Sequence, residues 1–268
     1  QALSSPPTTE NWEPNTENRK LKTTLPERYR VARRAPDLVV LEGFHALKHA
    51  LRFGAELLDV RAVRLDEVER LAAGLAPDVA DRIRSVAETV EDDVFARLSP
   101  TPHPTGIIAL ARRPVVRAAE IFETRGAEPV VLLEDPRSPW NVGAAVRVAA
   151  AAGAAALFVT GSADPWNPAA VRGAAGLHFA LPVGRIEGLP RTPRPLLAIH
   201  PEGDDLAPGS IPPGAILAFG TERHGLGRSI LDAADARIRI PMRPGVSSLN
   251  LATAVAVTLY AWRLGLTA

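Results

Sequence analysis

Polar side chains suited to holding a ligand follow three apolar segments in the second half of the chain. Asn141 and Arg147 follow "VVLLED", Glu222 follows "AILAFG", and Ser248 and Asn250 follow "RIRIPM". Amide, hydroxyl, carboxylate and guanidinium groups can orient a polar ligand by hydrogen bonds. If the apolar segments are parallel strands, these residues converge at one edge of the sheet, where such proteins bind ligands.

Each of these residues also has a structural interpretation. Asn141 has about even odds of being only a helix N-cap, and Arg147 taken alone is more simply a solvated residue. Glu222 is favourable in the first turn of a helix, and Ser247 or Ser248 is a plausible N-cap of the last helix. The joint placement after three successive strands favours a binding site for the set.

Several common motifs are absent from the sequence. No G-x-G-x-x-G follows a strand, and "GTERHGLG" lacks the Lys-Ser/Thr pair of a phosphate-binding loop. The segment "GVSSL" does not match the nucleophile elbow of hydrolases. His45 and His49 share a helix face without an evident third ligand, so a structural or surface role is favoured and we expect no metal.

The apolar pattern divides the chain into four regions. Residues 1–26 are polar and rich in Pro, Asn and Thr, which predicts a disordered tail. Residues 27–113 mix short strands with amphipathic helices and predict a small α/β domain, followed by a linker at 114–128. In residues 129–268, near-continuous apolar strands alternate with helices, as is typical of a parallel sheet covered on both faces.

Composition limits the classes of partner. The formal net charge is +1, so a nucleic-acid site would have to be a local patch. The chain has no Cys, which excludes disulfides and a thiolate nucleophile and agrees with a reducing cytoplasm. No apolar run approaches the length of a membrane span, so we expect no membrane partner.

Three segments resemble, in order, the motifs of the SpoU (TrmH-type) branch of SPOUT RNA methyltransferases. They are "DPRSPWNVGAAVRVAAAAG", "LAFGTERHGL" and "IRIPMRPGVSSLNLATAVAVTLY", and the resemblance covers residues 130–264. The segments "VLEGFHALKHAL" and "LSPTPHPTGIIALARRP" are similar to the small N-terminal, ribosomal-protein-like substrate-binding domain of many such enzymes. Val148 departs from the family pattern, which usually has Thr after the motif Arg.

The resemblance implies a parallel-sheet domain whose C-terminal segment forms a deep trefoil knot. It implies that this knot binds S-adenosylmethionine (SAM), largely through backbone groups, at Ile199, Gly220, Ile240 and Leu249. It also implies methyl transfer to a ribose 2′-hydroxyl without a metal, by a homodimer in which the partner chain completes the site.

The resemblance assigns roles to the polar residues named first. Because a guanidinium resists deprotonation, Arg147 would clamp the target phosphate and stabilise the developing alkoxide instead of acting as a base. Asn141 and Asn250 would orient Arg147, the ribose or the cofactor. Glu222 would position a partner Arg or a substrate group, and Ser248 would hydrogen-bond within its loop.

Binding of RNA requires further contacts, and ribosomal RNA is favoured over tRNA because of the additional N-terminal domain. The candidates are Arg30, Arg33, Arg34, Phe44, Arg112 and Arg113. For any one of them a solvated surface role is at least as plausible. A non-catalytic RNA-binding protein of the same fold remains the alternative of another class. Within the enzymatic hypothesis, methylation of the cell's own ribosomes that confers resistance to a ribosome-targeting antibiotic remains a variant.

Overall fold

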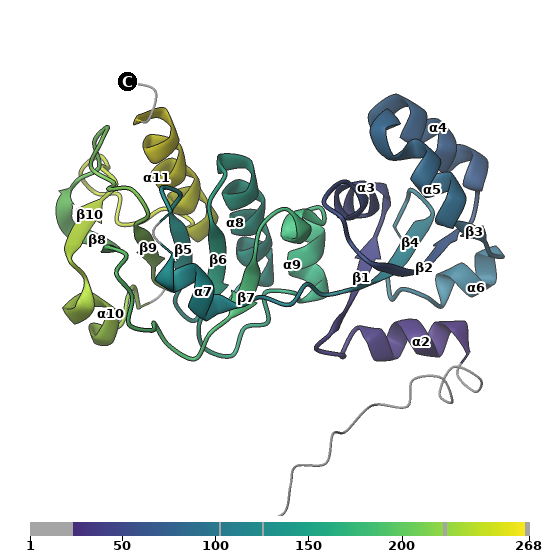
Figure 1. The fold of residues 1–268 in the computed structure, drawn as a ribbon, viewed down its shortest axis with the longest axis horizontal. Coiled ribbons are helices and arrows are strands. Elements are labelled where there is room, and N and C mark those ends of the chain that lie inside the picture. Colours follow the sequence, from purple (N-terminus) through teal and green to yellow (C-terminus); the bar gives the residue numbers. More distant parts are fainter. Residues whose placement is uncertain (1–23, 102, 125, 222–223, 266–268) are drawn as a thin grey trace, which may run out of the picture.

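Two β-sheets, each with its own helices, make up the fold of this computed structural model (Figure 1). The structure describes residues 24–101, 103–124, 126–221 and 224–265. The first sheet has four strands in the order β1-β4-β2-β3, and the second has six in the order β10-β8-β9-β5-β6-β7. No helix within the described ranges is both long enough and apolar enough to cross a bilayer.

The four-stranded sheet is mixed. Strand β4 (Ile107–Arg112) pairs antiparallel with β1 (Leu38–Glu42) and β2 (Leu57–Ala62), and the short β3 (Glu88–Thr89) runs parallel to β2. Its helical elements are α2 (Leu25–Ala32), α3 (Phe44–Arg52), α4 (Leu65–Leu75), η1 (Pro77–Val79), α5 (Ala80–Val86) and α6 (Asp92–Ala96). Buried residues of α3, α4 and α5 cover one face, whereas those of α2 and α6 cover the other.

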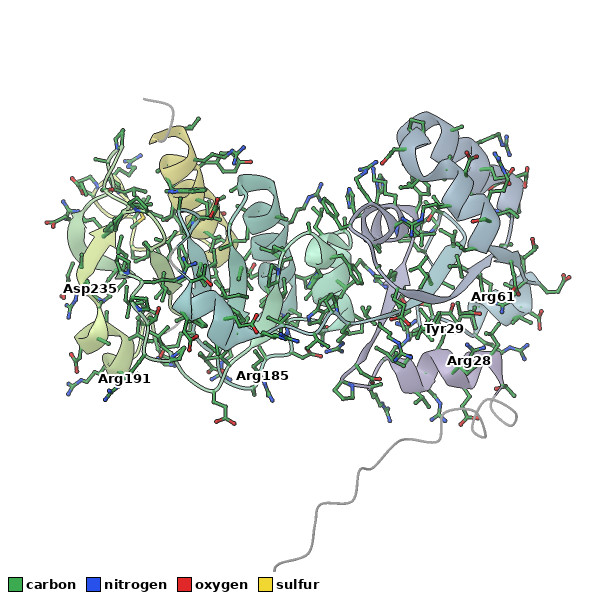
Figure 2. The ribbon with its side chains drawn as sticks, in the orientation of Figure 1. Arg28, Tyr29, Arg61, Arg185, Arg191 and Asp235 are labelled. Atoms are coloured by element: carbon green, nitrogen blue, oxygen red, sulfur yellow. The ribbon has the colours of Figure 1, made fainter. Side chains whose placement is uncertain are left out.

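Helix α2 corrects the expected boundary of the polar tail. The helix begins at Leu25, so residues 25 and 26 belong to a regular element instead of a tail that ends at 26. Tyr29 anchors the helix because its hydroxyl donates to the Asp59 carboxylate of β2 at 2.8 Å. Arg61 also contacts Asp59, at 2.7 Å, and lies near Tyr29 in Figure 2. Residues 1–23 lie outside the described ranges.

The six-stranded sheet is parallel throughout, as the apolar strand pattern predicts. Its strands are β5 (Val130–Leu133), β6 (Ala156–Val159), β7 (Val183–Arg185), β8 (Leu196–Asp205), β9 (Ile216–Phe219) and β10 (Ala236–Arg239). Every residue of β5, β6 and β9 is buried, because helices cover both faces of the sheet.

The helical elements of this sheet are α7 (Ala118–Glu123), α8 (Pro139–Ala152), α9 (Pro168–Gly173), η2 (Leu177–Phe179), α10 (Arg228–Ala233) and α11 (Leu251–Gly265). Buried residues of α8 and α11 share one core with residues of β5 and β9. Phe122 of α7 and Ile230 of α10 belong to the core on the opposite face. Helix α7 falls in the segment expected to be a linker.

The two sheets are joined by close contacts between α3 and the segment around η2. A Cβ on Gly176, which has φ +75°, would lie 2.5 Å from the Ala46 carbonyl oxygen. The His49 ring nitrogen Nδ1 lies 2.7 Å from the Ala175 carbonyl oxygen and donates to it. Figure 1 shows α9 between α8 and α3. One continuous core includes residues from both sheets, so α3 is held at a fixed position beside the six-stranded sheet.

Candidate active site

Asn250 and Asn141 bring the first and third sequence motifs into contact. The Asn250 Nδ2 amide donates to the Asn141 Oδ1 atom at 3.0 Å, although 109 residues separate them. Asn141 lies in the first turn of α8, which follows β5, and Asn250 lies directly before α11, which follows β10. The polar residues after these two strands therefore do converge.

Both helices are capped by residues other than those expected. Ser138 is the N-cap of α8 and accepts a bond from the Asn141 backbone N–H at 3.3 Å, so the side chain of Asn141 is not the cap. The Asn250 Oδ1 atom accepts from the backbone N–H groups of Ala252 at 2.9 Å and Thr253 at 3.3 Å. Asn250, and not Ser247 or Ser248, therefore caps α11, which leaves the Ser248 hydroxyl available for other bonds.

A cavity of about 130 Å³ lies beside the middle of β8 and the end of β10. It is lined by three of the four residues expected at a cofactor, Ile199, Ile240 and Leu249, and also by His200, Pro201, Arg239, Met242, Ser247, Ser248 and Ala254. Apolar side chains with a few hydroxyls are typical of small-molecule sites.

The loop at residues 241–249 forms one side of this cavity. Within the described residues, a single backbone hydrogen bond is recorded inside the loop, from Val246 N to Arg243 O at 3.2 Å. Backbone N–H and C=O groups that take no part in a helix or sheet can bind a ligand. The loop therefore fits a ligand that is held largely by the main chain.

Gly220 follows β9 and does not line this cavity. A Cβ at residue 220 would lie 2.0 Å from the Gly225 carbonyl carbon, so the two backbone segments can approach only because residue 220 is glycine. Glu222 lies outside the described residues.

Arg147 is exposed on α8 and is absent from the residues that line the cavity. It lies six residues after Asn141, which places the two side chains about 120° apart around the helix. Its charge reaches His45 of α3: burial, Lys48, His103 and Arg147 together lower the pKa of the His45 imidazole. The structure thus joins Asn141 to Asn250, whereas the charge of Arg147 acts on His45 of α3.

Phe44 does not present its ring to solvent, which corrects its expected role as an RNA-binding residue. The residue is 1% exposed and belongs to the core beneath the four-stranded sheet. Gly43 precedes the helix as its N-cap, Phe44 faces inward, and the exposed residue of this turn is His45.

Two of the five predicted RNA-binding arginines have structural bonds. Arg33 donates to the Leu98 carbonyl oxygen at 2.8 Å and pairs with the buried Glu42, also at 2.8 Å. Arg113 donates to the Leu38 carbonyl oxygen at 2.7 Å and pairs with Asp164 at 3.1 Å across the two sheets. Both side chains are mostly buried, so they hold the fold together.

The other three arginines are exposed. Arg30 pairs with Glu27 at 2.8 Å, and Arg112 pairs with Glu56 at 2.8 Å. Arg34 has no ion pair among the described residues. It lines a second cavity, of about 520 Å³, together with Arg33, Arg113 and Arg185. Arg185 is labelled in Figure 2, and the sequence analysis did not single it out.

Comparisons with known proteins agree with this geometry. The sequence matches the SpoU rRNA Methylase family over residues 128–260. It is 31% identical over 202 residues to an uncharacterised tRNA/rRNA methyltransferase of Synechocystis, covering 69% of this chain and 70% of that protein. It is 27% identical over 252 residues to the 23S rRNA (guanosine(2553)-2′-O)-methyltransferase RlmP of Bacillus subtilis, covering 91% and 95% of the two chains.

The fold is similar to that of a solved structure. The SpoU methyltransferase AviRb from Streptomyces viridochromogenes, solved in complex with AdoMet, superposes with a TM-score of 0.71 at 23% identity, covering 91% of this chain and 94% of that one. The sequence matches and this shared fold confirm the resemblance carried by the three motifs. The chain therefore belongs to the SpoU rRNA methylase family.

Proposed function

We propose that this chain transfers the methyl group of SAM to a ribose 2′-hydroxyl of ribosomal RNA. The observation that carries the proposal is the apolar cavity at Ile199, Ile240 and Leu249, which is followed directly in the chain by Asn250 and its bond to Asn141. Ribosomal RNA is favoured over tRNA because the RlmP match extends over 95% of that protein, including the N-terminal part. The cytoplasm is the compartment in which we expect this reaction.

The chain divides by function into two domains. Residues 27–113 would bind the RNA, residues 114–128 would connect the domains, and residues 129–268 would hold SAM. We also propose the trefoil knot of the family. Its support is the order of the strands: β8 lies between β10 and β9, and the loop after β10 leads to α11, which packs against α8.

The residues around the cavity fit the parts of SAM. Ile199, Ile240 and Leu249 would contact the adenine, and the backbone of 241–249 would bind the polar groups of the ligand. Gly220 would let the two backbone segments of the second motif, at residues 220 and 225, lie in contact. The cavity of about 130 Å³ is smaller than the roughly 300–1,000 Å³ of typical ligand sites, so we expect the exposed segment 243–248 to move outward on binding. SAM supplies a methyl group that is already activated on a sulfonium.

The polar residues of the chain position the acceptor. Arg147 would clamp the phosphate beside the target and stabilise the negative charge that develops on the 2′-oxygen. Since its guanidinium stays protonated, the hydroxyl proton passes to water. The hydrogen bond between Asn141 and Asn250 would hold the first and third motifs together. The Ser248 hydroxyl would form a hydrogen bond within its loop. The role of Glu222 stays a sequence-based prediction.

Transfer of labelled methyl from SAM to ribosomal RNA tests the proposal. Wild type should yield a labelled 2′-O-methyl nucleoside. Arg147→Ala should lower transfer about 100-fold or more with the Kd for SAM unchanged, whereas Leu249→Asp should weaken SAM binding itself. Arg70→Ala, on the exposed face of α4, is the control. Absence of both transfer and SAM binding in wild type would favour the non-catalytic RNA-binding protein, and label appearing only in tRNA would favour the alternative substrate.

A homodimer completes the site in this proposal. Arg147 does not line the cavity of its own chain, and α11 exposes Val257 (39%) and Tyr260 (41%) on one side. Large apolar side chains in a row are suited to a subunit interface. We infer that Arg147 of one protomer serves the cavity of the other.

Mixed dimers test this arrangement. A dimer that joins an Arg147→Ala protomer to a Leu249→Asp protomer keeps one intact site only if Arg147 acts across the interface. We therefore expect such a dimer to recover about half of the wild-type activity, although each variant alone is inactive. No recovery in the purified mixed dimer would show that Arg147 acts within its own chain.

A further inference from the structure

Helix α3 and helix α8, which carries Arg147, both pack against the segment around η2. Gly176 contacts Ala46 and Ala175 accepts the bond from His49, so α3 is fixed on the segment that also packs against α8. The contact is close, since any Cβ at residue 176 would collide with the backbone of Ala46. The two helices therefore keep their relative position without a ligand.

Trp140 is the large aromatic side chain on this side of α8, and 53% of it is exposed. Arg147 follows seven residues later, within about 20° around the helix, so the two side chains form one stripe. The indole lies beside α9, because a Cβ on Gly173 would be 3.5 Å from the Trp140 Cε3 atom. An indole held at one edge and open to solvent provides a surface for stacking.

His45 and Lys48 extend this surface onto α3. They lie one turn apart, and His45 is exposed. Burial, the charges of Lys48 and His103, and the charge of Arg147 all lower the pKa of His45. The imidazole is therefore neutral near pH 7, so it acts as a hydrogen-bonding group, whereas Lys48 brings an ammonium group with three donors.

We propose that Trp140, His45 and Lys48 form with Arg147 a single RNA-binding face in which the indole of Trp140 stacks on an unpaired base beside the methylated nucleotide. Lys48 contacts a backbone phosphate, and His45 hydrogen-bonds the ribose or the base edge next to Arg147. This inference rests on the proposed function, because it takes Arg147 to mark the target ribose. Unpaired bases stacked on aromatic side chains, with cations along the backbone, are the usual mode of RNA recognition.

Affinity for a fluorescently labelled transcript of large-subunit ribosomal RNA, measured by anisotropy on the full chain, tests the face. Trp140→Ala should weaken binding about tenfold, and Trp140→Phe, which keeps a smaller ring, should lose less. Lys48→Ala should weaken binding and reduce the dependence of log Kd on log salt by roughly 0.7 to 1. His45→Ala should raise the KM for RNA more than it lowers kcat.

The controls remove similar side chains elsewhere. Phe53→Ala deletes an aromatic residue that is 45% exposed just after α3, and Arg70→Ala deletes an exposed cation of α4. Both should bind the transcript as wild type does. All variants should keep the wild-type Kd for SAM and melting temperature.

Three outcomes would overturn the inference. They are unchanged RNA affinity in Trp140→Ala and Lys48→Ala, equal losses in the controls, and conversion of the Trp140→Ala dimer to monomers in sedimentation, which would assign the indole to a protein interface. The affinity measurement does not depend on turnover. If wild type binds the transcript through this face but transfers no methyl group, the proposed function fails and the RNA-binding face stands.

Discussion

Asn250 performs two structural tasks with the two ends of one amide. Its Oδ1 atom caps α11, and its Nδ2 atom binds Asn141. A serine hydroxyl would have to accept the capping bonds and donate to Asn141 from one oxygen on a shorter side chain, whereas the amide divides these roles between Oδ1 and Nδ2. The amide is therefore required by the pair of bonds and not by either bond alone.

Two substitutions separate the tasks of Asn250. Asn250→Ala removes the cap and the bond to Asn141, so it should lower the free energy of unfolding by about 1 kcal/mol and also lower methyl transfer. Asn250→Asp keeps the cap but presents a carboxylate oxygen to the Asn141 oxygen, so it should retain stability and still lose activity. Denaturant titration and the labelled-methyl assay measure the two effects. Full activity in Asn250→Asp would show that the bond to Asn141 is dispensable.

Residue types in the sequence indicated this pair, but not its geometry. Asn141 and Asn250 stood out because amides follow apolar strands at both positions. The caps were misassigned because Ser138, Ser247 and Ser248 are equally good capping types, and only the backbone path selects among them. Phe44 was misjudged because the sequence does not show which side of Gly43 faces the core.

Packing of α8 on α9 depends on a helical glycine. A Cβ on Gly143 would lie 2.2 Å from the Ala170 carbonyl oxygen, which is backbone and cannot move aside cheaply. Close helix contact of this kind places Trp140 beside Gly173, as described above. The position of the proposed RNA-binding face therefore follows from the small residues between these two helices.

Gly143→Ala should lower the free energy of unfolding by about 1–3 kcal/mol, because the added methyl group forces the helices apart. The matched control is Gly74→Ala in α4, where nothing lies within 4 Å of the added Cβ. This change should raise stability by about 0.5–1 kcal/mol, since alanine is the better helix former. Chemical denaturation of both variants measures the difference. Equal shifts in the two variants would contradict the packing argument.

Elements that coincide with clear apolar runs were predictable from the sequence, and several of the shortest elements were not. The strands β5, β6 and β9, of four residues each, coincide with continuous apolar runs, and the helices α8 and α11 coincide with long apolar segments. Strands β3 and β7 have two and three residues, and α7 and α10 have six each. Segments this short contain too few apolar positions to define a period.

For the molecule as a whole, the sequence predicted a parallel sheet but not the order of its strands. Strand order depends on contacts between distant segments, such as β8 with β10 and β9. The docking of α3 beside η2 is equally hidden, because it rests on Gly176 and on backbone oxygens and not on a recognisable side-chain pattern.

His178 makes the stability of this docked region depend on pH. Burial lowers its pKa to about 4, while its ring nitrogen Nε2 donates to the Pro165 carbonyl oxygen at 2.8 Å. The unfolded imidazole binds a proton below about pH 6.5, so between pH 6.5 and 4 the unfolded state holds more protons than the folded state. The free energy of unfolding should therefore fall as the pH is lowered through this window.

Denaturation curves of wild type and His178→Gln at pH 7.0, 5.5 and 4.5 measure the effect. The glutamine amide keeps a donor but does not titrate, so the loss of stability on acidification should be smaller in the variant, whatever its stability at pH 7. Parallel pH dependence in the two proteins would assign the acid sensitivity to other groups.

Glu42 connects the two sheets through a buried carboxylate. Ser99 donates to it at 2.6 Å and Arg33 pairs with it at 2.8 Å, both from the four-stranded half, whereas Arg172 reaches it from α9. Burial alone would raise the pKa of the Glu42 carboxyl. The bonds from Ser99 and Arg172 and the charges of Arg33 and Arg172 outweigh burial and lower the pKa below its usual value, so the carboxylate stays ionised. Separating the two halves would break the buried ion pair between Glu42 and Arg172, and breaking such a pair costs free energy because it leaves a buried charge without its partner. The two halves should therefore unfold in one cooperative transition, with no intermediate in which a single sheet survives.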